Sequence, residues 1–285
     1  MLGRQRQGSV VCPTCGRLVG VRDERCLICG TRNPSLWGFS QALRRLGDDL
    51  GFTKLLIFGC GALFLVSIFL SGGPQMGGGL FNLLSPRLDV LRLLGASGPI
   101  PIFVDGRWWT PLSATLLHGG LVHILFNMMW LRDLAPAVAR FYGAGRMVIV
   151  WTVAGVTGFA LSAVAGVVIP SLPFYGRRAG FAVGASAAIF GLLGALIWYG
   201  RRTGQKAMSK VVWGWAAAGF LIGLLPGIDN FAHLGGFVGG WVAARLLDPL
   251  RDERPGHVLT AIVCLVATVA AVVASVVTGL TVSGE

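Results

Sequence analysis

Two apolar stretches of the sequence each carry one residue of a pair that could perform nucleophilic catalysis. Ser186 lies at the start of one stretch, after Gly184 and Ala185, and His233 lies near the start of another. A serine hydroxyl is a weak nucleophile, but a neighbouring imidazole can take its proton and later donate it to the leaving group. If the two stretches lie side by side, these residues predict a hydrolytic Ser–His pair.

A third apolar stretch begins with His118, His123 and Asn127. His123 and Asn127 are four residues apart and share one face of a helix, whereas His118 is expected at the entrance of that helix. Side-chain donors from His123 and Asn127 could stabilise an oxyanion. The backbone N–H of Ser186 could do the same, because N–H groups in the first turn of a helix have no partner within it.

The composition is that of a membrane protein. Of the 285 residues, 54% are hydrophobic and 13% are charged, and the mean hydropathy is +0.71. Soluble domains contain about 25% charged residues. The net charge of +12 would suggest a nucleic-acid partner in a soluble protein, but here the distribution of the charge explains it better. The first 50 residues are polar and predict no cleavable signal peptide.

Apolar stretches recur at lengths that can cross a bilayer, which takes about 20 residues. Seven such spans are expected, at residues 53–71, 118–139, 146–169, 184–200, 210–226, 229–247 and 257–280. Between the first two, residues 83–94 combine leucines with charged side chains, which is typical of a segment at the membrane interface. The sequence therefore predicts an all-α polytopic membrane protein.

The lysines and arginines predict the orientation. With a cytoplasmic N-terminus, 19 of the 24 fall in cytoplasmic segments, which is the positive-inside bias and places the C-terminus outside. Arg44 and Arg45, before the first span, are interpreted as a topology signal. In this orientation the three spans with polar residues all descend from the outer face. Their polar groups then share one depth, as expected for a cavity rather than for lipid-facing surfaces.

Small residues predict that the fourth and sixth spans touch. His233, Gly236 and Gly240 share one helix face, and small residues let helix backbones approach closely. The fourth span offers Gly184, Ala188, Gly191 and Ala195. Such a contact would bring the hydroxyl of Ser186 within reach of the His233 ring. Taken singly, the same polar residues also fit helix packing or a proton-coupled transport site.

The motifs around these residues resemble those of the rhomboid family of intramembrane serine proteases. Residues 106–109 resemble the first loop of that family, and 118–127 match its HxxxxHxxxN pattern in the second span. Residues 184–187 match the GxSx pattern in the fourth span, and 232–240 match AHxxGxxxG in the sixth. The resemblance covers about residues 53–247, with all three span motifs in order.

The resemblance implies a six-helix core in which Ser186 is the nucleophile and His233 is the general base, without a carboxylate partner. It implies that His123 and Asn127 stabilise the oxyanion. The supporting residues implied are His118, Gly184, which shapes the turn, Phe190, at a position where the family often has a tyrosine against the catalytic histidine, and Asn230.

The sequence departs from the family at three places. Ala187 follows the serine, where many members have glycine, and Thr110 follows Trp109, where the family usually has arginine. Arg107 lies nearby at a shifted position. The seventh span is an addition found in some members, and it need not contribute to catalysis.

The polar N-terminal segment contains two CxxC motifs, formed by Cys12, Cys15, Cys26 and Cys29. Two such motifs predict a zinc site, and four thiolate ligands would make it structural. The alternatives are two disulfides or a redox pair, and a cytoplasmic location disfavours disulfides. The surrounding arginines favour anionic lipid over nucleic acid as a partner. Cys60 and Cys264 lie in apolar spans and are interpreted as buried hydrophobic residues.

These observations predict a cytoplasmic zinc ribbon at 1–36, a basic linker at 37–52, a protease core at 53–247, and a seventh span with a tail at 248–285. The predicted function is a serine endopeptidase that cuts single-span membrane proteins near the outer face of the cell membrane, with no cofactor for the chemistry. A catalytically silent membrane-protein binder is the first alternative. A small-solute transporter is the second, disfavoured because no internal repeat is visible. The oligomeric state is left open.

Overall fold

A computed structural model describes residues 4–12, 15–40, 46–76, 83–169 and 180–282. The chain divides into two compact units, Met1–Gly51 and Phe52–Glu285, which are considered separately. The predicted topology signal at Arg44 and Arg45 lies outside the described residues.

The N-terminal unit is built on a short hairpin. Strand β1 (Ser9–Val11) pairs antiparallel with β2 (Leu18–Gly20), with Val10 opposite Val19. A 3-10 helix, η1, follows at Leu36–Gly38. The buried side chains of this unit include Val10, Val19, Val21, Cys12 and Cys26. So small an apolar cluster stabilises a fold only weakly, and units of this size usually need a metal or disulfides.

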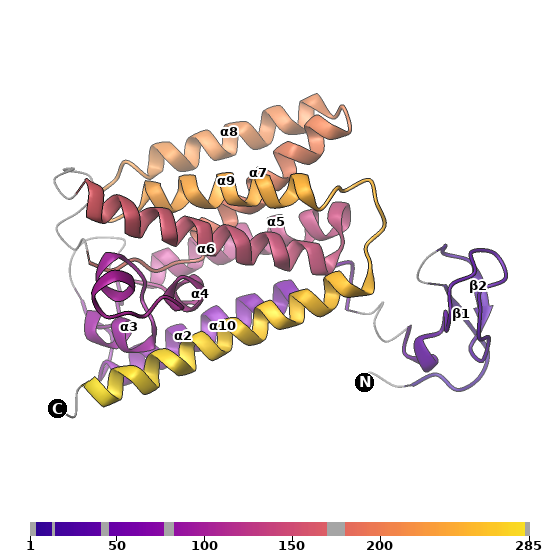
Figure 1. Cartoon of the computed structure of the whole chain (residues 1–285), viewed down its shortest axis with the longest axis horizontal. Helices are drawn as coiled ribbons and strands as arrows, with labels where there is room; N and C mark the ends of the chain where they lie inside the picture. Colours follow the sequence, from indigo (N-terminus) through magenta and orange to yellow (C-terminus); the bar gives the residue numbers. More distant parts are fainter. Residues whose placement is uncertain (1–3, 13–14, 41–45, 77–82, 170–179, 283–285) are drawn as a thin grey trace. The chain divides into compact units, whose positions relative to one another are not determined.

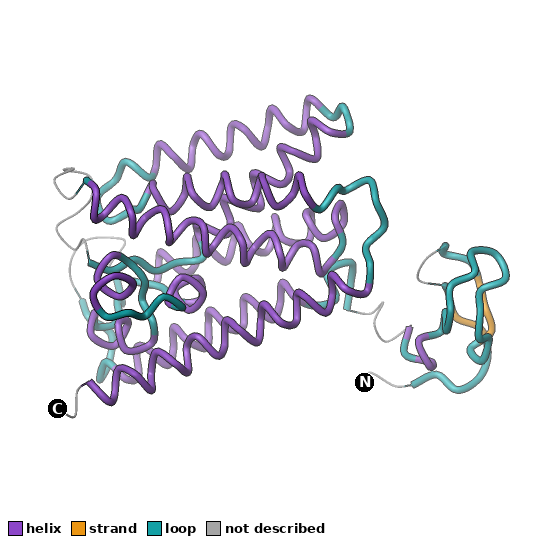
Figure 2. The backbone as a smooth tube through the Cα atoms, viewed as in Figure 1, coloured by secondary structure: helices purple, strands orange, loops and turns teal. Residues whose placement is uncertain are grey.

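The second unit is helical, as Figures 1 and 2 show. Its long helices among the described residues are α2 (Phe52–Leu70), α5 (Leu121–Tyr142), α6 (Ala144–Val168), α7 (Ser186–Arg202), α8 (Lys206–Ile222), α9 (Asn230–Leu246) and α10 (Pro255–Val282). They follow the predicted apolar stretches in order, which confirms the all-α fold class. The boundaries differ by a few residues: α8 begins at Lys206 rather than at 210, and α5 begins at Leu121, which leaves His118 in the preceding loop.

The described residues between α2 and α5 include four short helices. These are α3 (Leu88–Leu94), the π-helix η3 (Ile100–Val104), α4 (Thr110–Ser113) and the 3-10 helix η4 (Ala114–Leu116). In α3, Val90, Leu91 and Leu94 are buried, and the charged side chains lie on the other face. The placement of this segment at a membrane interface stays a prediction.

Within the part of the chain that the structure describes, three helices have the length and apolar composition to cross a membrane. These are α2, α6 and α10, with mean hydropathies of 2.1, 2.0 and 2.6. The bent pair 110–116 and 121–142, with an angle of 92° between its parts, adds a fourth if it is one span. Helices α7, α8 and α9 have 17 residues each, at the short end of the spanning range. The chain is thus a multi-pass membrane protein, and the number of seven spans stays a prediction.

Two glycine pairs on α9 determine how the central helices pack. A Cβ at Gly236 would collide with the backbone carbonyl of Ala187, and one at Gly240 would collide with the backbone of Gly191. The fourth and sixth predicted spans therefore touch backbone to backbone, as expected. The second pair, Gly235 and Gly239, lets α6 approach α9 closely, because a Cβ at Gly235 would lie 2.6 Å from the carbonyl oxygen of Thr157.

A buried arginine fixes the start of α10 to the start of α6. The side chain of Arg146 donates to the carbonyl oxygen of Arg251 at 2.6 Å and to Nδ1 of His257 at 3.1 Å, and its backbone N–H donates to Glu253 at 2.9 Å. These bonds satisfy a charge that would be costly to bury alone. The final helix is thereby held to the helical unit at this end.

We expect Gly236→Ala to destabilise the helical unit by about 1–3 kcal/mol, because the added methyl overpacks a backbone contact. Thermal unfolding of the detergent-solubilised protein measures this. The control is Gly59→Ala in α2, where an added Cβ meets no atom within 4 Å and helix propensity favours alanine. Equal melting temperatures for the two variants would contradict the close contact.

Candidate active site

Ser186 is the first residue of α7, and the backbone before it is held in an unusual conformation. Gly184 has φ +134°, a region that favours glycine. Its N–H donates to the carbonyl oxygen of Ala114 at 3.0 Å. Two residues earlier in the chain, Ala182 exchanges two backbone hydrogen bonds of 2.6 and 3.0 Å with Ser97. The loop before α5 therefore fixes the turn that presents Ser186.

His233 lies in the first turn of α9, and its Nε2 is 3.0 Å from Oγ of Ser186. Its other ring nitrogen, Nδ1, is 3.2 Å from Oδ1 of Asn230. An amide oxygen only accepts, so Nδ1 carries the proton and Nε2 is the acceptor for the serine hydroxyl. Asn230 is itself oriented by a 3.1 Å hydrogen bond from its amide to the carbonyl oxygen of Phe220. The geometry is that of a serine beside a base with a fixed tautomer.

The ring of His233 is also held by aromatic contacts. Phe190 stacks on it with a centroid distance of 4.2 Å and an interplanar angle of 16°, and Phe220 approaches it edge-on at 6.5 Å. Phe190 lies on α7 four residues after Ser186, so one helix supplies both Ser186 and the aromatic ring that stacks on His233.

His123 faces the turn before Ser186. Its Nδ1 accepts a 3.4 Å hydrogen bond from the N–H of Gly119, so in the neutral ring the proton lies on Nε2. A Cβ at Gly184 would lie only 2.7 Å from that Nε2. The donor is therefore directed at the backbone beside Ser186, and only glycine fits opposite it.

Asn127 and His118 lie on either side of His123. The amide of Asn127 donates to the carbonyl oxygen of His123 at 2.8 Å and retains a second N–H. His118 is fully buried, and its Nδ1 lies 3.3 Å from the carbonyl oxygen of Leu116. Its ring is edge-on to that of His123, with 5.2 Å between the ring centroids. All the candidate residues named from the sequence in this unit thus lie in one region around Ser186.

Two further residues, Asp229 and Phe220, contribute to the site and were not predicted from the sequence. Asp229 caps α9 by accepting from the N–H of Ala232 at 3.0 Å, and it also accepts from the hydroxyl of Ser162. Asp229 belongs to the residue types that cap helices, so its place before the apolar stretch could have indicated this role. Phe220 gave no such signal, because its contact with His233 depends on how α8 packs.

The four N-terminal cysteines form a cluster in the other unit. Their sulfur atoms all lie within 4.8 Å of one another, with 3.7 Å between Cys12 and Cys29 and 3.6 Å between Cys15 and Cys26. Zinc–sulfur bonds of about 2.3 Å in a tetrahedron place sulfurs about 3.8 Å apart. The hydroxyl and backbone of Thr31 hydrogen-bond Cys29 and lower the pKa of its thiol to about 6. The described cysteines are not disulfide-bonded, and their arrangement fits a tetrahedral metal ion.

Comparison with known proteins agrees with the motifs. A family model described as Rhomboid domain matches residues 105–249. Rhomboid protease GluP of Bacillus subtilis is 33% identical over 171 residues, which are 58% of this chain and 31% of that protein. RHOMBOID-like protein 4 of Arabidopsis thaliana is 28% identical over 209 residues, or 65% of this chain and 50% of that protein.

Rhomboid-type serine protease 2 of Emericella nidulans is 31% identical over 140 residues, or 47% of this chain and 26% of that protein. The chain thus spans half or less of the length of these curated relatives. The matched region contains Ser186, His233, His123 and Asn127.

We expect Phe190→Leu to slow the reaction of Ser186 with a fluorophosphonate about two- to tenfold, the equivalent of an aromatic contact of about 0.5–1.5 kcal/mol. The measurement is the second-order labelling rate constant. Phe64→Leu, at a buried phenylalanine of α2, is the control for general loosening of the core. Equal labelling rate constants for the two variants would contradict a role of Phe190 in supporting the His233 ring.

Proposed function

Because the chain belongs to the rhomboid family, we propose that it is an intramembrane serine endopeptidase that hydrolyses peptide bonds in or near the membrane spans of other proteins. The observation that carries this proposal is the 3.0 Å approach of Ser186 Oγ to His233 Nε2, with Asn230 bonded to the opposite ring nitrogen. A serine placed only for packing does not require an oriented base beside it.

The proposed reaction begins with attack of Ser186 Oγ on the substrate carbonyl carbon while His233 Nε2 takes the hydroxyl proton. The carbonyl oxygen becomes an oxyanion. We propose that it accepts hydrogen bonds from His123 Nε2, from the free amide N–H of Asn127 and from the backbone N–H of Ser186. His233 then donates its proton to the leaving amine, and the peptide bond breaks to give an acyl ester on Ser186.

Deacylation reverses these roles. His233 takes a proton from water, the resulting hydroxide attacks the ester, and the proton returns to Ser186 Oγ as the new carboxyl end leaves. Asn230 and Phe190 act throughout as positioning residues, because they keep the imidazole tautomer and ring plane suited to both proton transfers. The chemistry needs no metal ion or organic cofactor.

The substrate proposed is a single-span membrane protein. Peptide carbonyls inside a helix are hydrogen-bonded and shielded, so the helix must unwind before Ser186 can attack. Helix-breaking residues near the cleaved bond would favour this. We propose that cleavage occurs near the outer face, with the N-terminus of the protease in the cytoplasm and its C-terminus outside, which is the orientation that the lysine and arginine distribution favours.

For the N-terminal unit, we propose a structural zinc ion bound by Cys12, Cys15, Cys26 and Cys29. The tetrahedral spacing of the sulfurs and the small apolar cluster around them support this. Four protein ligands leave no open position for a substrate, so the ion would stabilise the ribbon and take no part in proteolysis.

We expect a fluorophosphonate to label the detergent-solubilised protein, and Ser186→Ala or His233→Ala to reduce the labelling rate at least about a thousandfold. The same variants should fail to cleave a reconstituted single-span substrate. Ser67→Ala, at a buried serine of α2 that bonds to its own helix, is the matched control and should behave like wild type. A folded wild type that neither labels nor cleaves would favour the silent-binder alternative.

We expect the purified protein to contain about one zinc ion per chain, as a four-thiolate site binds, and Cys26→Ser to lose it. Elemental analysis of protein prepared without added chelator measures this. Cys60→Ala, at the buried cysteine of α2, should retain the zinc. The zinc proposal fails if wild type contains no zinc or if Cys60→Ala loses as much as Cys26→Ser.

A further inference from the structure

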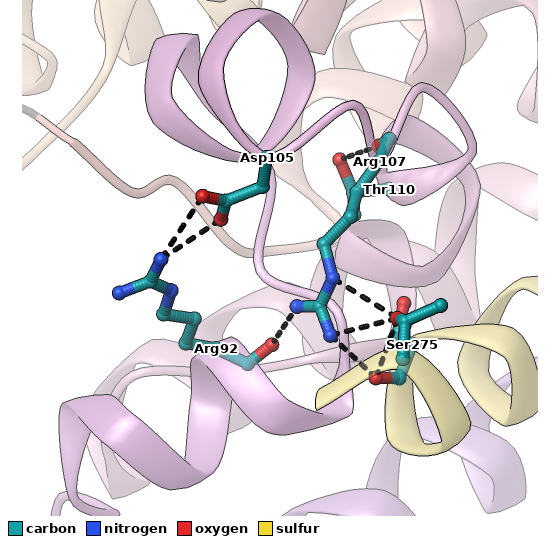
Figure 3. Close-up of polar contacts among 6 residues, drawn as sticks. Arg92, Asp105, Arg107, Thr110 and Ser275 are labelled. Atoms are coloured by element: carbon teal, nitrogen blue, oxygen red, sulfur yellow. Dashed lines mark hydrogen bonds and ion pairs between the residues drawn. The ribbon is translucent and has the colours of Figure 1, made fainter. Parts of the chain in front are cut away.

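Arg107 connects the loop before α5 to the final helix (Figure 3). Its guanidinium donates to the carbonyl oxygen of Ser275 at 2.6 Å and to the hydroxyl of Thr278 at 2.9 and 3.1 Å. A third nitrogen donates to the carbonyl oxygen of Arg92 at 3.0 Å. Trp109 adds a 3.0 Å hydrogen bond from its indole N–H to the hydroxyl of Ser275. We call these four residues, Arg107, Trp109, Ser275 and Thr278, the clasp.

Two residues of the clasp are buried and two, Trp109 and Thr278, are half-buried, so its bonds are partly shielded from water. Arg107 is 6% exposed and Ser275 is 0% exposed. The segments also pack closely, because a Cβ at Gly95 would lie 2.6 Å from the hydroxyl oxygen of Ser275 and one at Gly279 would lie 2.7 Å from the side chain of Leu93. Breaking one partner would leave a buried donor without an acceptor, which is costly.

The segment held by the clasp contacts the turn before the nucleophile in two places. The hydroxyl of Thr110 donates to the carbonyl oxygen of Arg107 at 2.9 Å and lies 3.3 Å from the hydroxyl of Ser97. Ser97 in turn shares its two backbone bonds with Ala182, and Ala114 accepts from the N–H of Gly184. A continuous set of hydrogen bonds therefore connects α10 with the residues just before Ser186.

The other end of α10 is fixed as well. Arg146 and Glu253 hold the start of this helix to α6, so the clasp binds to a helix that is anchored in the helical unit. A loop bonded to such a helix is restrained, whereas a loop bonded to an unanchored helix would move with it.

We propose that α10 is a positioning element of the active site, and that Arg107 is the positioning residue through which it acts. The clasp holds residues 95–116, these hold Ala182 and Gly184, and Ser186 is thereby kept in register with His233 and His123. The inference rests on the proposed function, because its effect is on the rate of the Ser186 reaction. The family usually has an arginine at the position of Thr110. In this chain Arg107, three residues earlier, would anchor the loop instead.

The test uses Ser275→Ala combined with Thr278→Val in the full-length protein. This double variant removes two acceptors of the clasp and keeps the shape of α10. The matched control is Thr268→Val on the same helix. The hydroxyls of Thr268 and Thr278 each donate to the carbonyl four residues earlier at 2.8 Å, but only Thr278 also accepts from Arg107.

Substrate cleavage gives the first readout. We expect the double variant to lower kcat about tenfold with KM within about twofold, because a small misplacement of reacting groups slows the chemical step more than it weakens binding. Thr268→Val should match wild type in both constants. Adding Arg107→Gln to the double variant should lower kcat further, since it also removes the bonds to the carbonyl oxygens of Ser275 and Arg92, which the double variant retains.

Amide hydrogen exchange gives a readout that does not depend on activity. The amides of Ala182 and Gly184 should exchange faster in the double variant than in Thr268→Val, since their hydrogen bonds open more often when the loop is released. Unchanged exchange at these amides overturns the proposal. Faster exchange with an unchanged kcat reduces the clasp to a structural contact and also overturns it. A wild type that neither cleaves nor labels refutes the proposed function, and the exchange comparison still decides whether the clasp reaches the nucleophile turn.

Discussion

The close contact between α7 and α9 is the constraint on which the site depends. Gly236 and Gly240 let the backbone of α9 rest against Ala187 and Gly191, and this separation places the ring of His233 3.0 Å from Ser186. Larger side chains at these positions would move the helices apart by more than a hydrogen bond tolerates. In lipid, where no hydrophobic force drives helices together, such close packing also supplies much of the attraction between them. The packing of the two helices and the approach of His233 to Ser186 therefore depend on the same residues.

The polar groups around this contact are arranged so that few are left unpaired. Asn230 serves two partners at once, His233 on α9 and the carbonyl of Phe220 on α8. Asp229 caps α9 and also accepts from Ser162 on α6. Two of these bonds join the start of α9 to neighbouring helices, and the other two lie within the start of α9 itself. Polar groups in a low-dielectric interior are costly when unpaired and rigid when paired, so the same network that allows a hydrophilic site in this unit also holds the His233 ring and the start of α9 in place.

Arginine plays a comparable part at the two ends of α10. Arg146 and Arg107 each satisfy several backbone carbonyls of different segments, a task suited to the planar guanidinium with its five donors. From the sequence, the seventh span, which corresponds to α10, need not contribute to catalysis. Its bonds to the loop before α5 instead relate it to the turn that carries Ser186, and this relation is the basis of the positioning role proposed above.

The sequence by itself determined the helical class, the order of the apolar stretches and the identity of the polar residues that gather around Ser186. These follow from hydrophobic runs, from glycine spacing and from motif residues, all of which are local features. It also indicated the cysteine cluster, because two CxxC motifs bring their ligands together by chain proximity. Only the tertiary structure decided that His118 lies before α5 rather than in it, that Phe220 borders His233, and that Arg107 bonds to Ser275 across 168 residues of chain. Contacts of that kind depend on how whole helices pack, and no local sequence pattern predicts a contact between side chains so distant in the chain.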